Sequence, residues 1–296
     1  MDNLRGAALM VLSMLGFAVE DMLIKLVAEV LPIGQILFML GVGGATVFAI
    51  VVKLQGDALF VPQMRSIPIL LRAVGELAGT MAFVSAIVLT PLSSASAILQ
   101  ATPLAVTMGA AIFLGEQVGW RRWSAVTVGL MGVLLIIRPG MASFEPLSLL
   151  AVIAVFGLGM RDLATRRVPR TISTMQLSFL GFAAVIPAGP LMLWLGGQPP
   201  VAPVGQPLLL FCGALFIGLF AYYAIVAAVR LGDLGFVAPF RYSRMLFALV
   251  IGVMVFDESP DALTLTGAAI IVASGIYTVL RERKTQRALS NAQPSV

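Results

Sequence analysis

Long apolar runs, separated by short charged or Pro/Gly-rich breaks, make up most of the chain. Each run has about 20 residues, the length at which an α-helix rising 1.5 Å per residue crosses a hydrocarbon core of about 30 Å. The runs lie at residues 5–27, 33–53, 66–88, 92–114, 122–138, 146–165, 173–195, 206–230, 234–256 and 261–280. This pattern predicts an all-α integral membrane fold of ten transmembrane helices with short connections.

The composition supports a membrane protein. Of the 296 residues, 59% are hydrophobic and only 11% are charged, whereas a soluble domain typically has about 25% charged residues. So few charges cannot cover a water-facing surface, and the remaining apolar surface must therefore face lipid. The first run contains Glu20 and Asp21 and has no clear small-residue cleavage site, so we predict a retained helix and not a cleavable signal.

Several chemistries are excluded by the residues that the chain contains. It has no histidine, and its one cysteine, Cys212, lies in an apolar run without a second cysteine to pair with. None of the lysines Lys25, Lys53 and Lys284 follows a glycine, so there is no Walker A phosphate loop. We therefore expect no enzymatic activity, no cofactor, no metal site and no nucleic-acid partner.

Basic residues are distributed unevenly between the predicted loops. If the N-terminus is cytoplasmic, the inner segments carry 13 Lys and Arg residues, and the outer loops carry only Lys25 and Arg138. An excess of Lys and Arg marks cytoplasmic loops. We therefore expect both termini in the cytoplasm, with residues 282–296 as a basic tail. Trp120 and Trp123 are expected to anchor the chain in the interface, which makes membrane lipid a partner.

The chain also contains an internal repeat. Residues 17–25 align with residues 158–166 at an offset of 141, and residues 112–116 align with residues 254–258 at an offset of 142. The alignment pairs Asp21 with Asp162, Lys25 with Arg166, and Glu116 with Glu258.

Two such halves, residues 1–140 and 141–281, would hold five helices each. Because five is an odd number, the second half enters the membrane from the opposite side. Inverted-topology repeats of this kind recur in secondary transporters, which bind substrate near the midplane where the repeats meet.

Four short motifs carry a resemblance to a known family. They are AILQATP at 97–103, FLGE at 113–116, FDE at 256–258 and GAAIIVASG at 267–275. In these motifs the chain resembles the drug/metabolite transporter superfamily in its ten-helix EamA-type form. It is most similar there to the amino-acid exporter branch that includes aromatic amino-acid exporters. The resemblance implies export of amino acids or related metabolites across a bacterial inner membrane.

Charged residues inside the predicted helices are the candidates for function. Even on insertion scales, such a charge costs about 2.5–3.5 kcal/mol at the membrane centre, so it is expected to face the protein interior. Four acidic and four basic residues qualify: Glu20, Asp21, Arg72, Glu76, Arg161, Asp162, Arg241 and Arg244. Balanced charge of this kind suits a zwitterionic substrate, and it would also arise from purely structural ion pairs.

Glu76 lies near the centre of the third predicted helix, with Arg72 four residues earlier on the same face. The two residues form either a self-neutralised pair or a site for a substrate ammonium group or a proton. Arg241 and Arg244 lie three residues apart on the ninth helix. They are candidates to bind a substrate carboxylate or to act in a gate, and the alternative is internal salt bridges to Glu76 or Asp162.

Glu20 and Asp21 in the first helix and Arg161 and Asp162 in the sixth are related by the repeat. They are either interface residues that reach for lipid headgroups or two gates that close in alternation, one on each side. Pro103 in the middle of the fourth helix frees a carbonyl and permits a bend, as a hinge or as a static kink.

Several uncharged residues complete the candidate cavity. Two of them, Gln100 and Thr102, lie in the fourth helix beside a stripe of small residues that we expect to permit close helix packing. The other cavity candidates are Phe83, Tyr222, Tyr223, Tyr242 and Met245. The two halves differ here, because Met245 stands opposite Pro103 in the repeat, so they need not move alike.

The sequence therefore predicts a secondary transporter that exports amino acids or related small metabolites by alternating access, with protons as candidate coupling ions. The alternatives within transport are a nucleotide-sugar-like compound or S-adenosylmethionine. A membrane scaffold without transport activity is a further alternative.

Overall fold

The computed structural model describes residues 2–141, 143–169, 171–231 and 234–292. Within these residues it is all-helical, with ten spans that are long and apolar enough to cross a membrane, which confirms the predicted fold class. The first five spans are α1 (Asp2–Val27), α2 (Ile33–Leu54), α3 (Ile67–Leu89), the pair α4 (Leu92–Leu99) and α5 (Thr102–Phe113), and α6 (Trp120–Ile137).

The other five spans begin with α7 (Leu149–Thr165). They continue with the pair α8 (Thr174–Val185) and α9 (Ala188–Gly196), then α10 (Gln206–Leu231), the ninth span, and α13 (Ala262–Ala292). The ninth span consists of the 3₁₀ turn η3 (Ala238–Tyr242) and α12 (Ser243–Phe256), and the short helix α11 (Leu234–Val237) precedes it. Two further 3₁₀ turns, η1 (Pro62–Arg65) and η2 (Pro146–Ser148), precede α3 and α7.

Proline lies at each broken span. Proline lacks a backbone N–H and clashes with the preceding turn, which interrupts an α-helix. Pro103 is the second residue of α5, Pro187 separates α8 from α9, and Pro239 lies in η3. The predicted bend at Pro103 is therefore a break between two helices in the structure.

The last helix extends beyond its predicted end. α13 continues to Ala292 and so runs through most of the segment predicted as a basic tail, because that segment is rich in the helix-favouring residues Arg, Lys, Gln and Ala. Residues 293–296 lie outside the described part of the chain.

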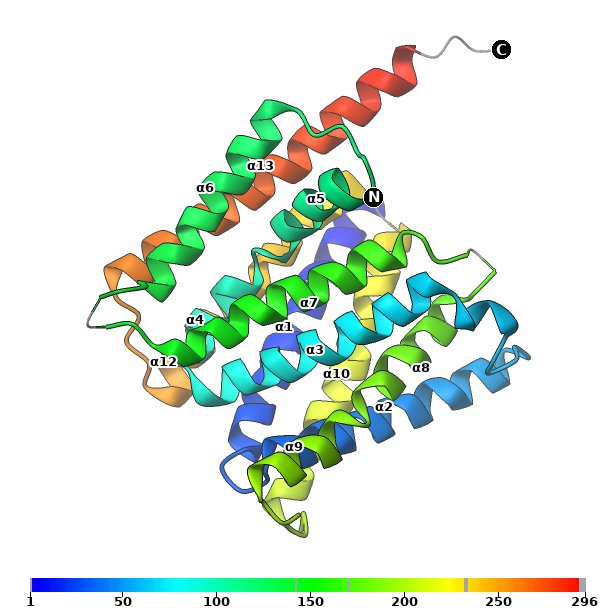
Figure 1. The fold of residues 1–296 in the computed structure, drawn as a ribbon, viewed down its shortest axis with the longest axis vertical. Coiled ribbons are helices and arrows are strands. Elements are labelled where there is room, and N and C mark those ends of the chain that lie inside the picture. Colours follow the sequence, from blue (N-terminus) through cyan, green and yellow to red (C-terminus); the bar gives the residue numbers. More distant parts are fainter. Residues whose placement is uncertain (1, 142, 170, 232–233, 293–296) are drawn as a thin grey trace.

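The packing of the helices follows the repeat. α1 packs along α10, and α3 packs along α7 (Figure 1). Since α7 is the counterpart of α1 and α10 is the counterpart of α3, the contact of α3 with α7 is the repeat equivalent of the contact of α1 with α10. The contacts α1 with α12 and α7 with α5 are related in the same way. This arrangement fits two halves of inverted topology that interlock across one shared core.

Glycines permit the closest helix crossings, and Gly75 and Gly79 of α3 form a GxxxG pattern of the kind found at such crossings. A Cβ atom on Gly75 would lie 2.7 Å from the backbone nitrogen of Arg161, and one on Gly157 would lie 2.7 Å from Gly79. At the related crossing, Gly16 of α1 meets Ala221 of α10. These contacts fix the backbones of α3 and α7 against each other.

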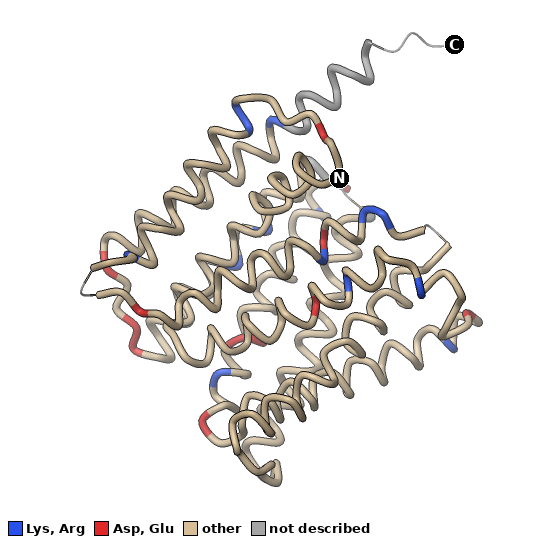
Figure 2. The backbone as a smooth tube through the Cα atoms, in the orientation of Figure 1, with Lys and Arg blue, Asp and Glu red and all other residues tan. Residues whose placement is uncertain are grey.

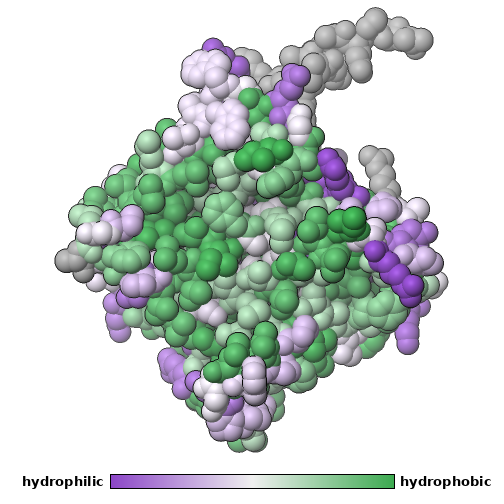
Figure 3. Space-filling model, viewed as in Figure 1, coloured by the Kyte–Doolittle hydropathy of each residue, from purple (hydrophilic) through white to green (hydrophobic). Residues whose placement is uncertain are grey.

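The surface is apolar over most of the face shown in Figure 3, with hydrophilic residues gathered at its edges. Charged residues lie mainly at the two ends of the bundle, and a few lie along the interior helices (Figure 2). Below, "terminal end" means the end at which α1 begins and α13 ends, and "far end" means the opposite one (Figure 1).

Candidate functional site

Asp21 and Arg244 form a forked ion pair between the first half and the second. The Arg244 Nη2 atom lies 2.9 and 2.7 Å from the two carboxylate oxygens of Asp21, and its Nε donates to one of them at 3.2 Å. Asp21 is only 3% exposed. The rings of Phe17 and Phe83 each lie 5.2 Å from the Arg244 guanidinium carbon. The pair therefore joins α1 to α12 inside the bundle, with aromatic rings against the cation.

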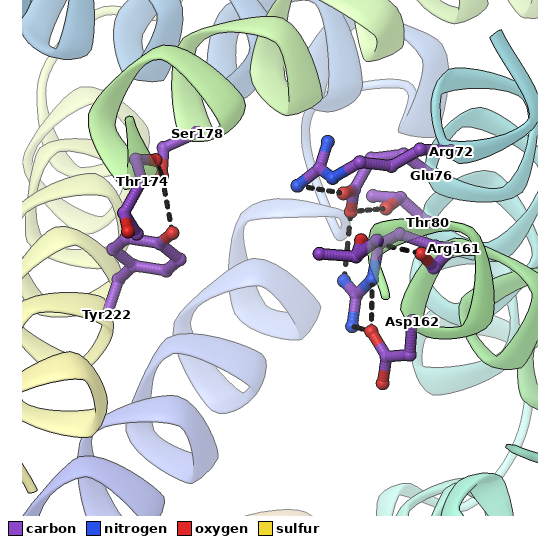
Figure 4. Close-up of polar contacts among 9 residues, drawn as sticks. Arg72, Glu76, Thr80, Arg161, Asp162, Thr174, Ser178 and Tyr222 are labelled. Atoms are coloured by element: carbon purple, nitrogen blue, oxygen red, sulfur yellow. Dashed lines mark hydrogen bonds and ion pairs between the residues drawn. The ribbon is translucent and has the colours of Figure 1, made fainter. Parts of the chain in front are cut away.

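A second charge cluster lies between α3 and α7. Arg161 Nη1 lies 3.1 Å from a carboxylate oxygen of Glu76, and Arg161 Nη2 lies 2.8 Å from a carboxylate oxygen of Asp162. Arg72 lies 3.6 Å from the other oxygen of Glu76. Figure 4 shows the four side chains in one group, with Thr80 beside Glu76. Two guanidinium groups thus neutralise two carboxylates where α3 packs against α7.

An ion pair at the far end joins the two halves. Lys25 Nζ lies 3.8 Å from a Glu258 oxygen and donates to the Thr90 carbonyl at 2.6 Å. The Glu258 carboxylate also accepts hydrogen bonds from the backbone N–H groups of Leu92 and Ser93 and from the Ser93 hydroxyl. A carboxylate at the start of a helix satisfies its free N–H groups and interacts favourably with its dipole. Glu258 therefore holds the end of α12 against the start of α4.

The repeat places a related ion pair at the terminal end. Arg166 Nη1 lies 3.0 Å from a Glu116 oxygen, and these residues are the counterparts of Lys25 and Glu258. Their side chains are 43% and 41% exposed, against 16% and 9% for Lys25 and Glu258. The two ends are therefore closed to different degrees: the far-end pair is enclosed and the terminal-end pair is open.

Outside the spans, Arg138 and Asp261 form another contact at the far end. Hydrogen bonds from Arg138 and from Thr264 hold the pKa of the Asp261 carboxyl below its usual range. This pair links the end of α6 to the start of α13.

The structure separates the two arginines that the sequence grouped together. Arg244 lies inside the bundle, whereas the side chain of Arg241 is exposed. The prediction that both lie well within the membrane assumed a helix from residue 234. A helix does begin at Leu234, as α11, but Arg241 lies in the 3₁₀ turn η3 that follows it, between α11 and α12. The predicted alternative partners of Arg244, Glu76 and Asp162, are bound by Arg161, and its actual partner is Asp21.

The uncharged candidates fall into two groups. Gln100 donates from Nε2 to the Arg241 carbonyl at 3.2 Å, which connects the break of the fourth span to η3. Thr102 hydrogen-bonds to the Leu99 carbonyl, so its hydroxyl serves the same break. Tyr242 and Met245 are buried beside this region.

The two tyrosines lie elsewhere. The hydroxyl groups of Tyr222 and Ser178 are hydrogen-bonded (Figure 4), and Tyr222 and Tyr223 line a cavity of about 490 Å³ between α2, α8 and α10. Tyr223 is 69% exposed. These residues therefore form a group apart from the two charge clusters.

Sequence reasoning missed two features of these contacts. It identified Glu258 as the repeat partner of Glu116 but did not include it among the site residues, although it joins the halves. It also missed Ser178. The available signal for Glu258 was Pro91, because proline is favoured at the start of a helix, where the free N–H groups need an acceptor.

A family model described as the EamA-like transporter family matches the chain twice, at residues 4–138 and 146–280. Similar proteins include the S-adenosylmethionine uptake transporter of Rickettsia felis, at 26% identity over 70% of this chain and 69% of that protein. The riboflavin transporter of Vibrio cholerae is 31% identical over 67% and 65%. The pseudopaline exporter CntI of Pseudomonas aeruginosa is 29% identical over 92% and 94%.

A solved crystal structure also resembles the fold. It superimposes with a TM-score of 0.56 at 20% sequence identity, over 92% of this chain and 98% of that one. At this level of identity, the likeness concerns the fold alone.

Proposed function

The chain belongs to the EamA-like transporter family, and from this membership we propose that it is a secondary transporter that exports an amino acid or an amino-acid-derived metabolite by alternating access. The similar proteins are named as transporters, in agreement with the expectation of no enzymatic activity. Two of them, named for S-adenosylmethionine and pseudopaline, have substrates that contain amino-acid groups, and riboflavin has none. An aromatic amino acid remains within the proposed substrate class.

The observation that carries this proposal is the pair of charge clusters at the interface of the two halves. In each cluster a side chain of one half binds a side chain of the other: Asp21 binds Arg244, and Glu76 binds Arg161. A substrate with an ammonium and a carboxylate group can exchange with such pairs without a change in net charge. We propose Arg244 and Arg161 as partners of the carboxylate and Glu76 as the partner of the ammonium group.

The two end pairs support alternating access. Lys25–Glu258 at the far end and Arg166–Glu116 at the terminal end occupy equivalent positions of an inverted repeat, and they are enclosed to different degrees. In an inverted repeat, each half can adopt the conformation of the other half. The enclosed end then becomes the open one, and the open end becomes enclosed. The described conformation corresponds to a transporter that is closed at the far end.

The orientation that we propose places the terminal end in the cytoplasm of a bacterial inner membrane. The support is the count of 13 inner against two outer basic residues. In this orientation the enclosed pair faces outward, and the described conformation is the inward-facing one. On the basis of the same repeat, we propose that the first half consists of residues 1–140 and the second half of residues 141–281.

A transport assay tests the proposal. Proteoliposomes containing the wild-type protein would be loaded with single radiolabelled amino acids, with S-adenosylmethionine or with riboflavin, and efflux would be followed. We expect saturable efflux of at least one amino-acid-containing compound, and its loss in Glu76→Gln and Arg244→Ala. The matched control, Glu29→Gln, removes a carboxylate from the exposed turn after α1 and should leave efflux unchanged.

Each result leads to a different conclusion. Efflux retained in both Glu76→Gln and Arg244→Ala would show that these charged residues form structural ion pairs and do not bind the substrate. Efflux of riboflavin alone would move the substrate out of the amino-acid class. No efflux of any compound from demonstrably folded protein would contradict the proposed substrate class and leave another metabolite, such as a nucleotide-sugar-like compound, or a scaffold role.

A further inference from the structure

Glu20 differs from the other charged residues of the interior in having no partner of its own. Among the described residues, the structure shows no hydrogen bond or ion pair to its carboxylate. Its neighbour Asp21 binds Arg244 through both carboxylate oxygens. Three other acidic residues of the interior, Asp21, Glu76 and Asp162, are each bound by an arginine.

The charge balance of the two clusters shows the consequence. The cluster between α3 and α7 contains Arg72, Glu76, Arg161 and Asp162 and is neutral. The cluster between α1 and α12 contains two carboxylates, Glu20 and Asp21, against the single guanidinium of Arg244. The repeat explains the difference, because the counterpart of Glu20 at an offset of 141 is Arg161, the residue that neutralises the other cluster. One negative charge is therefore uncompensated when Glu20 is ionised.

Glu20 is partly exposed, and its carboxylate lies at a close crossing of α1 and α10. Its carboxylate lies against the backbone of Gly218 in α10, so close that even a methyl group added to Gly218 would collide with it. The same crossing is tightened by Gly16 against Ala221 and by the hydrogen bond from the Ser13 hydroxyl to the Ala221 carbonyl, at 2.6 Å. A proton needs no space of its own at this crossing, because it binds directly to a carboxylate oxygen.

The charged groups that act on Glu20 come from two helices. Asp21 on α1 is a like charge, and Arg244 on α12 is an opposite charge already bound to Asp21. From α10 the residue in contact is the uncharged Gly218, and the nearest ionisable side chain along that helix, Tyr222, has its hydroxyl bound to Ser178. From α3 the ring of Phe83 lies beside Arg244. An ionised carboxylate without its own donor or counter-charge is costly in such a place.

We propose that Glu20 is a proton-binding site and carries the proton that is exchanged during transport. In the described conformation its carboxyl group holds the proton. When α1 and α10 separate enough to admit water, the O–H bond breaks, the proton passes to water, and the carboxylate remains. This inference rests on the proposed transport function for its role, but the protonation itself does not depend on the substrate.

Infrared spectroscopy of the full-length protein in lipid nanodiscs tests the protonation without a substrate. We expect wild-type protein at neutral pH to show the C=O stretch of a protonated carboxyl group that disappears on alkaline titration. Glu20→Gln should lose this band. The control Glu29→Gln and the conservative variant Glu20→Asp should retain a titrating band, with its midpoint shifted in Glu20→Asp. A band of unchanged size in Glu20→Gln, or no such band in the wild type, would overturn the proposal.

Transport under an imposed pH gradient tests the coupling, with the same panel of amino acids, S-adenosylmethionine and riboflavin. Wild-type efflux should respond to the gradient, and Glu20→Gln should transport with this response lost. An equal response in Glu20→Gln would overturn the coupling role. The wild-type protein could show no transport of any compound and still have an infrared band that depends on Glu20. This result would support the proton site and contradict the proposed function, so the two failures are distinguishable.

Discussion

At the scale of single residues, the interior charges show how much depends on partners that are distant in the sequence. Asp21 and Arg244 are 223 positions apart, yet they form the forked pair between α1 and α12. The sequence predicted the local pair of Arg72 and Glu76, four residues apart, and the structure contains it at 3.6 Å. It also contains the shorter contact of Glu76 to Arg161, at 3.1 Å. Helical spacing reveals local neighbours only.

The pair of Asp21 and Arg244 should contribute strongly to stability. Asp21→Asn leaves the Arg244 guanidinium in the interior without its carboxylate, and breaking a buried pair typically costs about 3–5 kcal/mol. We expect a clear fall in the thermal unfolding midpoint of the purified protein in detergent. The matched control is Asp57→Asn in the exposed loop after α2, which should leave the midpoint unchanged. Equal midpoints for the two variants would show that the pair contributes nothing.

At the scale of helices, the glycine crossing of α3 and α7 determines where Glu76 and Arg161 meet. The two helices approach so closely that a Cβ on Gly75 would lie 2.7 Å from the backbone of both Gly157 and Arg161. The GxxxG pattern of Gly75 and Gly79 is typical of tight packing, but it does not identify α7 as the partner. The spacing of small residues shows which face of a helix can pack closely, but it does not show which other helix packs against that face.

Gly75→Ala should therefore push α3 away from α7. We expect a loss of stability of about 1–3 kcal/mol, the usual range for overpacking, together with weaker transport, because Glu76 and Arg161 lie on this crossing. Gly196→Ala is the control, since its nearest neighbouring atom would be 3.7 Å from the new Cβ. The measurement is the unfolding midpoint in detergent. A Gly75→Ala protein as stable as Gly196→Ala would show that the crossing tolerates expansion.

At the scale of the whole molecule, the two end pairs predict that cross-linking either end stops transport. Lys25→Cys with Glu258→Cys, or Arg166→Cys with Glu116→Cys, would be made after replacing Cys212, the one native cysteine. A short reducible cross-linker across either pair should abolish efflux, because alternating access requires each end to open in turn. Reduction should restore it. Efflux that persists with the far end fully cross-linked would argue against alternating access.

The orientation of the whole molecule can be tested separately. A green fluorescent protein fused after Val296 should fluoresce, and alkaline phosphatase fused at the same place should be inactive, because we expect the C-terminus in the cytoplasm. The same pair of reporters at the N-terminus should give the same result, since ten spans return the chain to its starting side. An active phosphatase at either terminus would reverse the proposed orientation.

The sequence by itself determined the number of spans, their approximate ends, the repeat and the set of interior charges. These features follow from local quantities: the length of each apolar run, the cost of a charge in hydrocarbon, and the similarity of residues at a fixed offset. It also predicted a bend at Pro103, where the structure has a break between α4 and α5.

Only the tertiary structure decided which charges meet. It assigned Asp21 to Arg244, placed Glu258 at the start of α4, left Arg241 exposed, and gave Glu20 no counter-charge among the described residues. The physical reason is that an ion pair depends on distances of a few ångströms between helices, and a local pattern carries no information about those distances. The charged groups available to this transporter can therefore be read from its sequence, whereas the way in which these groups pair can be read only from its fold.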